Sequence, residues 1–286
     1  MKAAVLCIAL LLGLGAPAAT QQAQQVQQVP PIRLRTFHFV DRSRTIGLPD
    51  GRRVPRPVTT IVRYPATGGP YPLVVFGHGF ALGPGAYAGL LQAWARAGFV
   101  VAAPIFPLGN AHAPGGPNEA DLLNQPRDLS FAITRLLHGP LRARIDAGRI
   151  AVAGHSDGAE TALAAAYDRR YRDRRVRAAI VLSGAALPGM GPFPRHGPPL
   201  LAVQGTDDPI NRPVATSSYF RAARRPKFLL WLLGASHLPP YTEQPQLGIV
   251  ERATIAFLDH YLEGRPLSAF TRAARRPGLT RLVADP

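Results

Sequence analysis

The chain has 286 residues, 47% of them hydrophobic, so it can form one large domain with a substantial core and is not expected to be disordered. Its net charge of +16 comes almost entirely from arginine. The arginines are scattered instead of being interleaved with aromatic residues on one segment, so we expect no nucleic acid partner. We expect a basic, solvated surface. The alternative is a weak contact of the clusters Arg169 to Arg177 and Arg272 to Arg276 with an anionic polymer or lipid headgroup.

Residues 1–18 are predicted to be a secretory signal peptide. Lys2 supplies the charged start, an apolar run follows, and Ala16-Pro17-Ala18 is typical of a cleavage site. The alternative, an uncleaved membrane anchor, is disfavoured because the run is shorter than the roughly 20 residues that span a bilayer. We therefore expect a secreted, periplasmic or cell-envelope protein without a transmembrane segment in the mature chain. The single cysteine, Cys7, would leave with the peptide, so no disulfide is expected.

Residues 19–31 are rich in glutamine and end in two prolines, which predicts a flexible tether. Residues 32–286 show no further linker and no internal repeat, so we expect one domain. Its expected strands and helices alternate, with strands at 35–41, 58–66, 71–79, 99–106, 149–154, 176–184, 199–205 and 227–234, and helices at 85–99, 119–141, 157–170 and 247–264.

This alternation predicts an α/β fold. Continuous apolar strands separated by helices indicate a mostly parallel central sheet with helices on both faces. In such sheets, functional residues gather where strands end and helices begin. The candidate residues are therefore sought at those junctions.

The stretch "IAVAGHSDGAETALAAA" (150–166) carries a serine on a strand-to-helix turn. Gly154 and Gly158 flank Ser156 in a Gly-x-Ser-x-Gly pattern, which alone is weak because both residue types are common. Between a strand and a helix it predicts a nucleophile held on a strained turn. Side chains at the two glycine positions would collide with the neighbouring strand and helix. We therefore predict that Ser156 is a nucleophile.

A serine hydroxyl needs a base, and the base needs an orienting acid. "PLLAVQGTDDPI" offers Asp207 and Asp208 after a strand, and the strand-Gly-x-x-Asp spacing favours Asp208. "KFLLWLLGASHLPPY" offers His237 after the last strand. Of the other histidines, His155 is expected to be structural, and those in loops or in the final helix are disfavoured as the base.

A tetrahedral intermediate needs two backbone donors for its oxyanion. One is the amide after the nucleophile, that of Asp157. The other is expected in the loop after an earlier strand, "LVVFGHGFAL", where the amide of Phe80 is the candidate. The alternative, a plain glycine turn, is disfavoured by the matching serine turn downstream.

In this order, "FGHGF", "GHSDGA", "GTDDP" and "GASH" resemble the α/β-hydrolase superfamily over roughly residues 55–262. The resemblance is to the branch with platelet-activating-factor acetylhydrolases, chlorophyllases, dienelactone hydrolases and bacterial polyester hydrolases. It implies ester hydrolysis through an acyl-enzyme on Ser156. The chain departs from dienelactone hydrolases, which use cysteine, and from polyester hydrolases, which usually carry a tryptophan in the segment that here lacks one and a C-terminal disulfide.

Residues 185–198 are too few for a large lid domain, so none is expected. That loop could wall an acyl pocket with Leu187, Met190 and Phe193, and Tyr241 could form another wall; an ordinary surface loop is the alternative. No metal cluster or phosphate-binding loop is seen, so no metal and no cofactor are expected.

The predicted function is that of a secreted serine hydrolase of small-molecule or lipid carboxylic esters, with a triad of Ser156, Asp208 and His237. Two alternatives stay open. The same triad serves an amidase or peptidase, and a non-catalytic relative could use the basic surface to bind an envelope component.

Overall fold

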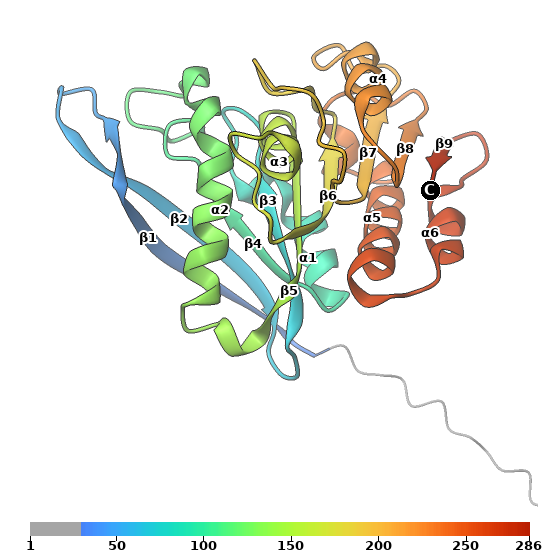
Figure 1. Cartoon of the computed structure of the whole chain (residues 1–286), viewed down its shortest axis with the longest axis horizontal. Coiled ribbons are helices and arrows are strands. Elements are labelled where there is room, and N and C mark those ends of the chain that lie inside the picture. Colours follow the sequence, from blue (N-terminus) through green and yellow to red (C-terminus); the bar gives the residue numbers. More distant parts are fainter. Residues whose placement is uncertain (1–29) are drawn as a thin grey trace, which may run out of the picture.

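The computed structural model describes residues 30–286. The expected signal peptide and nearly all of the expected tether lie outside the described residues. Nine strands form one sheet in the order β1-β2-β4-β3-β5-β6-β7-β8-β9 (Figure 1). The strands are β1 (Ile32–Gly47), β2 (Arg53–Pro65), β3 (Tyr71–Gly77), β4 (Val100–Pro104), β5 (Ile145–His155), β6 (Val176–Leu182), β7 (Leu200–Gly205), β8 (Lys227–Leu232) and β9 (Thr280–Asp285).

The centre of the sheet is parallel and its two edges are antiparallel. Strands β4, β3, β5, β6, β7 and β8 run in one direction, whereas β1 and β2 at one edge and β9 at the other pair antiparallel with their neighbours. The central strands are buried on both faces, as their continuous apolar sequences predict. The predicted α/β-hydrolase fold with a mostly parallel sheet is confirmed.

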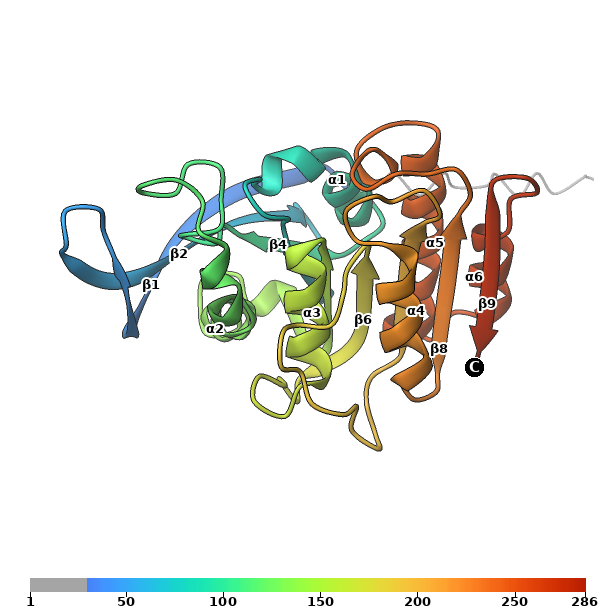
Figure 2. The same cartoon turned by 90° about the horizontal axis from the view of Figure 1, so that it is seen from above.

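Helices cover both faces of the sheet (Figure 2). One hydrophobic core packs the sheet against α2, α3 and α4, and a second core packs the other face against α1, α5 and α6. The helices are α1 (Ala88–Arg96), α2 (Gln125–Leu137), α3 (Asp157–Tyr167), α4 (Pro213–Ala222), α5 (Gln246–Glu263) and α6 (Leu267–Ala274). No helix in residues 30–286 has the length and apolar character that crossing a membrane requires.

The structure adds elements that the sequence patterns did not predict. Helices α4 and α6 and strand β9 occur in segments left unassigned, and β1 and β2 form a much longer hairpin than expected. Strands β1 and β9 lie at the two edges of the sheet and are largely exposed, so few of their residues follow the buried pattern of a core strand.

A buried ionic network ties the β1–β2 hairpin to α2 and to the segment before it. Arg56 of β2, 1% exposed, donates bidentate hydrogen bonds to both Asp121 and Asp128 at 2.6–2.8 Å. Arg44 of β1 also reaches Asp128, at 2.7 Å, and Asp41. Asp121 belongs to a short 3-10 helix, η2 (Glu119–Asn124), so this network fixes the position of η2 beside the active-site end of the sheet.

Candidate active site

Ser156 lies on the sharp turn between β5 and α3. Its backbone has φ 55° and ψ −124°, which is costly for a residue with a side chain and is typical of strain held at a functional site. A Cβ at Gly154 would lie 2.0 Å from the Gly158 carbonyl oxygen, and one at Gly158 would lie 2.0 Å from the Gly77 carbonyl oxygen. The expected collisions with helix and strand are therefore found at both glycines, and close packing there keeps Ser156 in its strained conformation.

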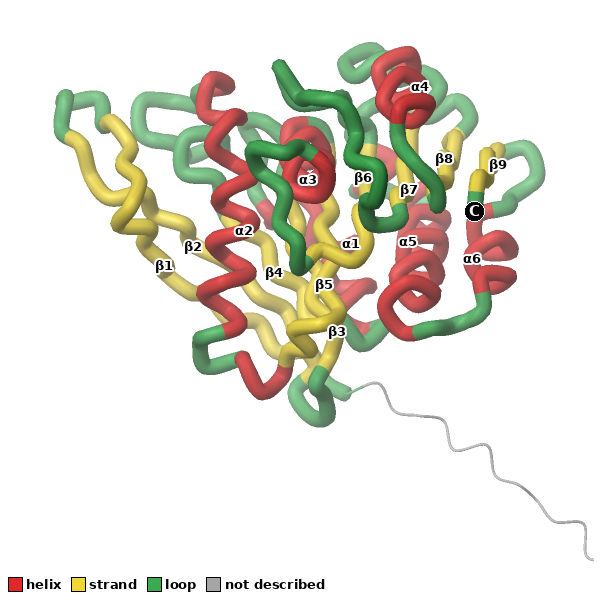
Figure 3. The backbone as a smooth tube through the Cα atoms, in the orientation of Figure 1, coloured by secondary structure: helices red, strands yellow, loops and turns green. Residues whose placement is uncertain are grey.

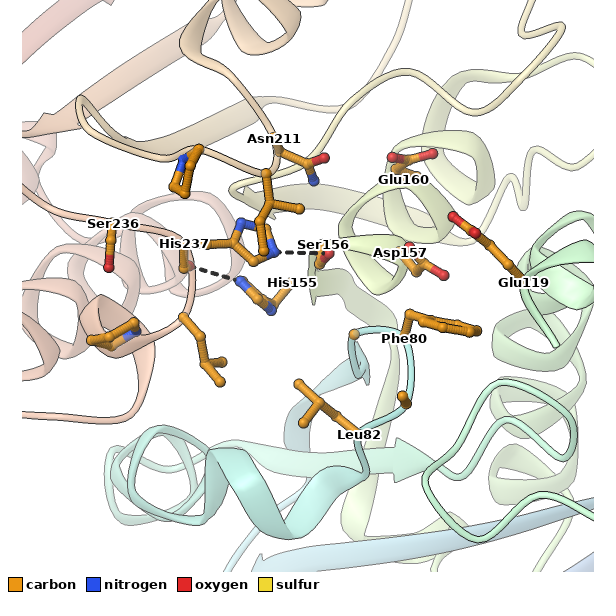
Figure 4. A pocket seen from close by; sticks show the side chains of 16 residues that line it. Phe80, Leu82, Glu119, His155, Ser156, Asp157, Glu160, Asn211, Ser236 and His237 are labelled. Carbon is orange, nitrogen blue, oxygen red and sulfur yellow. Dashed lines mark hydrogen bonds between the residues drawn. The ribbon is translucent and has the colours of Figure 1, made fainter. Parts of the chain in front are cut away.

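The structure brings Ser156, His237 and Asp208 together from three loops, and Figure 4 shows the contact between Ser156 and His237. The Oγ hydroxyl of Ser156 donates to Nε2 of His237 at 3.0 Å, and Nδ1–H of His237 donates to Oδ2 of Asp208 at 2.8 Å. This arrangement leaves Nε2 free to accept the serine proton, because the carboxylate holds the other proton on Nδ1. The geometry is that of a nucleophile, a general base and an orienting acid.

Asp208, not Asp207, is the acid in reach of His237. Its carboxylate is 3% exposed and accepts hydrogen bonds from the backbone amides of Ile210 and Asn211 and from Nε2 of Gln204, at 2.9–3.1 Å. These donors fix its orientation and compensate for its burial. Asp207 is exposed and accepts only from Thr206.

A buried histidine orients the loop that presents the Phe80 amide. Nδ1–H of His78 donates to the Gly79 carbonyl oxygen at 2.8 Å, and its Nε2 accepts from the Phe106 amide at 3.0 Å. Because the N–H and C=O of one trans peptide point in opposite directions, the Phe80 amide faces away from His78. The Phe80 amide donates no hydrogen bond within residues 30–286. The Asp157 amide lies in the first turn of α3, where backbone amides have no partner within the helix. Both are thus available to an oxyanion.

His155, the residue immediately before Ser156, is neutral because it is buried. Nε2–H of His155 donates to the His237 carbonyl oxygen at 3.0 Å, and Nδ1 accepts from the Tyr87 hydroxyl at 2.8 Å. The Tyr87 oxygen in turn accepts from the Gly79 amide at 3.2 Å. Desolvation, reinforced by the nearby His237, lowers the pKa of His155 to about 3, and desolvation lowers that of His78 to about 4.

The chlorophyllase family model matches residues 40–214, more than half of the chain. The chain belongs to the chlorophyllase family. The match includes Ser156 and Asp208 and ends before His237. No curated protein sequence matches the chain.

A solved structure extends the comparison to the whole fold. The ferulic acid esterase from Streptomyces cinnamoneus aligns with a TM-score of 0.69 over 90% of this chain and 96% of its own, at 22% identity. At this identity the likeness concerns the fold. The chlorophyllase-family assignment and this fold together identify the protein as a carboxylic-ester hydrolase of the α/β-hydrolase superfamily.

The chlorophyllase-family hydrolase has a cavity of about 600 Å³ at Ser156. Apolar groups from Phe80, Leu82, Ile210 and Leu238 form much of its wall, and the hydroxyl of Ser156 reaches it directly. The cavity is large enough for a small or medium-sized ester. Its full lining is Gly79, Phe80, Ala81, Leu82, Glu119, His155, Ser156, Asp157, Glu160, Pro209, Ile210, Asn211, Ser236, His237, Leu238 and Pro239.

The four side chains expected to wall the acyl pocket do not line this cavity. The loop between β6 and β7, a green tube near α3 in Figure 3, packs on the outer side of α3. Leu187 is buried there against Ala164. Met190 and Phe193 instead border a separate hollow of about 400 Å³ with α4.

Tyr241 has a different place from the one expected. It is fully buried, its ring lies 4.9 Å from that of His155, and its hydroxyl bonds to Ser183 and to the Val203 carbonyl oxygen. It packs against His155 and does not line the cavity. Leu187, Met190 and Phe193 were expected at the wall because they lie in the loop between two strands, and Tyr241 because it closely follows His237. The loops around Phe80 and Ile210 supply the wall instead.

Sequence reasoning missed three acidic side chains at the cavity. Glu119, Asp157 and Glu160 all line it, although Asp157 was expected to contribute only its amide. Desolvation, followed by the charge of Glu119, raises the pKa of Asp157 to about 6. Desolvation and the charges of Asp157 and Glu119 raise that of Glu160 to about 8. The spacing of Asp157 and Glu160 on α3 was a usable signal, but Glu119 is brought in only by the fold.

Proposed function

We propose that this protein is a serine hydrolase that cleaves carboxylic esters through an acyl-enzyme on Ser156. The observation that carries the proposal is the pair of hydrogen bonds that link Ser156 to His237, at 3.0 Å, and His237 to Asp208, at 2.8 Å. Such a nucleophile suits the class of carboxylic-ester hydrolases, and no other serine in residues 30–286 combines a strand-to-helix turn with a histidine base.

In the acylation step, Ser156 Oγ attacks the ester carbonyl carbon while Nε2 of His237 takes the hydroxyl proton. Asp208 holds the imidazole in the productive tautomer and stabilises the imidazolium. The amides of Phe80 and Asp157 donate to the developing oxyanion. Nε2–H then protonates the leaving alkoxide, and the alcohol departs.

In the deacylation step, His237 removes a proton from water, and the resulting hydroxide attacks the acyl carbonyl. The oxyanion forms again between the same two amides. Its collapse releases the carboxylic acid and returns the proton to Ser156. Each proton taken by His237 is thus given back within the cycle.

The substrate class we propose is a small-molecule or lipid ester, and the site of action is outside the cell or in its envelope. The apolar wall formed by Leu82, Ile210 and Leu238 supports an uncharged acyl or alcohol group on that side. The N-terminal Lys2, its apolar run and Ala16-Pro17-Ala18 support export. The same triad would serve amide cleavage, so matched ester and anilide substrates separate the two reactions.

The test replaces Ser156 and follows both turnover and covalent labelling. Ser156→Ala is expected to lower kcat for p-nitrophenyl esters by roughly 10⁵-fold or more, because the nucleophile is lost. It should also lose labelling by a fluorophosphonate probe. Ser218→Ala, which removes an exposed serine of α4, should retain both. Unchanged hydrolysis by folded Ser156→Ala would overturn the proposal, and a chain-length panel from acetate to palmitate would define the acyl group.

A further inference from the structure

Three carboxylates gather at one end of the cavity. Asp157 and Glu160 stand in the first turn of α3, three residues apart and hence on one side of the helix. Glu119 begins η2, which the Arg56 network holds beside α3. Figure 4 shows the three on the opposite side of Ser156 from His237. They therefore border the same cavity in which an ester bound at Ser156 would lie.

Within residues 30–286, no lysine or arginine forms a salt bridge with this group. The chain has 33 lysines and arginines against 17 acidic residues, and most acidic residues of the described part form salt bridges. Yet no lysine or arginine lines the cavity, and none within residues 30–286 pairs with Glu119, Asp157 or Glu160. In a protein this basic, three acidic side chains at one cavity without a basic partner form a local reversal of charge when they are ionised.

One of the three also lacks a hydrogen-bond partner. Asp157 is 8% exposed, and its Oδ2 atom is buried without any partner. A buried acceptor in that condition costs about 1–3 kcal/mol in general. The unfavourable environment is equally visible in the raised pKa values of Asp157 and Glu160, about 6 and about 8. A cation placed among the carboxylates would favour their ionised form and offset this electrostatic penalty.

The surroundings favour an organic cation over a metal ion. In the part of the chain that the structure describes, no three acidic, histidine or cysteine side chains are arranged to hold a metal. The ring of Phe80 lies beside Asp157 and Glu119 in Figure 4. An aromatic side chain and carboxylates that line the same cavity form an environment suited to an ammonium group.

We propose that Glu119, Asp157 and Glu160 form a subsite that binds an ammonium group of the ester substrate. The subsite determines specificity and rests on the proposed function, since it places the cation relative to Ser156. A favourable interaction with the positive N-terminal end of α3 could explain why acidic residues occupy positions 157 and 160. It does not account for Glu119, which comes from another segment, nor for the unpartnered Oδ2 atom.

The first experiment compares substrates of one shape that differ only in charge. For the alcohol side the pair is butyrylcholine and 3,3-dimethylbutyl butyrate. For the acyl side the pair is a p-nitrophenyl ester whose chain ends in trimethylammonium and its isostere ending in tert-butyl. On one of the two sides, kcat/KM for the cationic member should exceed that of its isostere by about tenfold or more. The side that responds identifies the end of the substrate that the subsite holds.

The second experiment removes the charges. In the double variant Glu119→Gln/Glu160→Gln, the ratio of kcat/KM for the cationic and neutral members should fall to near one. The ratio cancels any catalytic loss that both substrates share. The control Glu251→Gln removes one charge on α5, across the sheet, and should keep the wild-type ratio. Glu119→Lys, at an exposed position, should reverse the preference.

Direct binding separates this proposal from the proposed function. Benzyltrimethylammonium should bind the wild type and Ser156→Ala equally in calorimetry, and at least about tenfold more weakly to the double variant. If no ester is turned over but this binding holds, the function fails and the subsite stands. Equal kcat/KM for both isosteres on both sides, or binding unaffected by the double variant, would overturn the subsite.

Discussion

Nε2–H of His155 donates a hydrogen bond to the backbone carbonyl of His237, so the residue before the nucleophile holds the loop of the proposed base. The other ring nitrogen accepts from Tyr87, whose oxygen accepts from the Gly79 amide in the loop that presents the Phe80 amide. One neutral imidazole thus connects three separate loops. A protonated ring could not accept from Tyr87, which is why burial of this histidine matters.

Replacement of His155 should therefore slow catalysis without removing the nucleophile. His155→Leu leaves the His237 carbonyl and Tyr87 without their partner, and we expect kcat to fall by about 10–100-fold because small displacements of catalytic groups are costly. His155→Gln, which can still donate to the carbonyl, should recover part of the loss. Slow but complete fluorophosphonate labelling would show that Ser156 persists. Wild-type kcat in folded His155→Leu would contradict this role.

The turn at Ser156 should tolerate no side chain at Gly158. Gly158→Ala would bring a Cβ to 2.0 Å from the Gly77 carbonyl oxygen, a backbone atom of β3 that cannot move aside alone. We expect a loss of about 3 kcal/mol or more in the free energy of unfolding, or failure to fold. Gly85→Ala, where a Cβ meets nothing within 4 Å, is the control and should change stability by less than about 1 kcal/mol. Urea unfolding of the two variants measures the difference.

The sequence predicted the parts of the site that follow strands. Ser156, Asp208 and His237 each come directly after an apolar strand, and parallel strands deliver their carboxyl ends to one edge of the sheet. The short segments "GHSDG", "GTDD" and "GASH" therefore carried enough information to bring three distant residues together. The continuous apolar pattern of the central strands made the fold predictable in the same way.

The cavity wall and the group of Glu119, Asp157 and Glu160 could not be predicted from strand ends. Glu119 reaches the cavity because Arg56, on a distant strand, anchors η2 through buried carboxylates, and no local pattern records such a contact. Tyr241 follows His237 closely in sequence, yet a 3-10 turn directs it into the core under His155. Strand β9 gains its order from pairing with β8, not from its own alternation.

The Arg56 network should stabilise the folded state only while Arg56 and both of its aspartate partners are present. Arg56→Met leaves Asp121 and Asp128 buried without their main partner, which should lower the free energy of unfolding by about 3–5 kcal/mol. The matched control is Arg52→Met, which breaks an exposed ion pair with Asp50 and should leave the free energy of unfolding almost unchanged. Chemical denaturation of both variants at one pH checks the contrast. A similar loss in the two would contradict the importance of burial.

The raised pKa of Glu160 predicts a stability change with a definite sign. Its pKa is about 8 in the folded protein against an ordinary 4.5, so between these values the folded state binds more protons than the unfolded one. Stability contributed by this group therefore falls as pH rises from 4.5 and is lowest above pH 8. Glu160→Gln cannot ionise, and it should raise the free energy of unfolding at pH 9 by about 1–3 kcal/mol, a range reduced for partial exposure.

At pH 4.5 the same substitution should change stability little, because the carboxyl is largely protonated when folded and neutral like the amide. The measurement is urea unfolding at the two pH values, with Glu243→Gln, at an exposed position outside the cavity, as the control for lost surface charge. An equal gain at both pH values would assign the effect to packing. A gain confined to high pH would mean that the chain retains an ionisable group at a cost in stability, which is expected where a carboxylate serves binding and not folding.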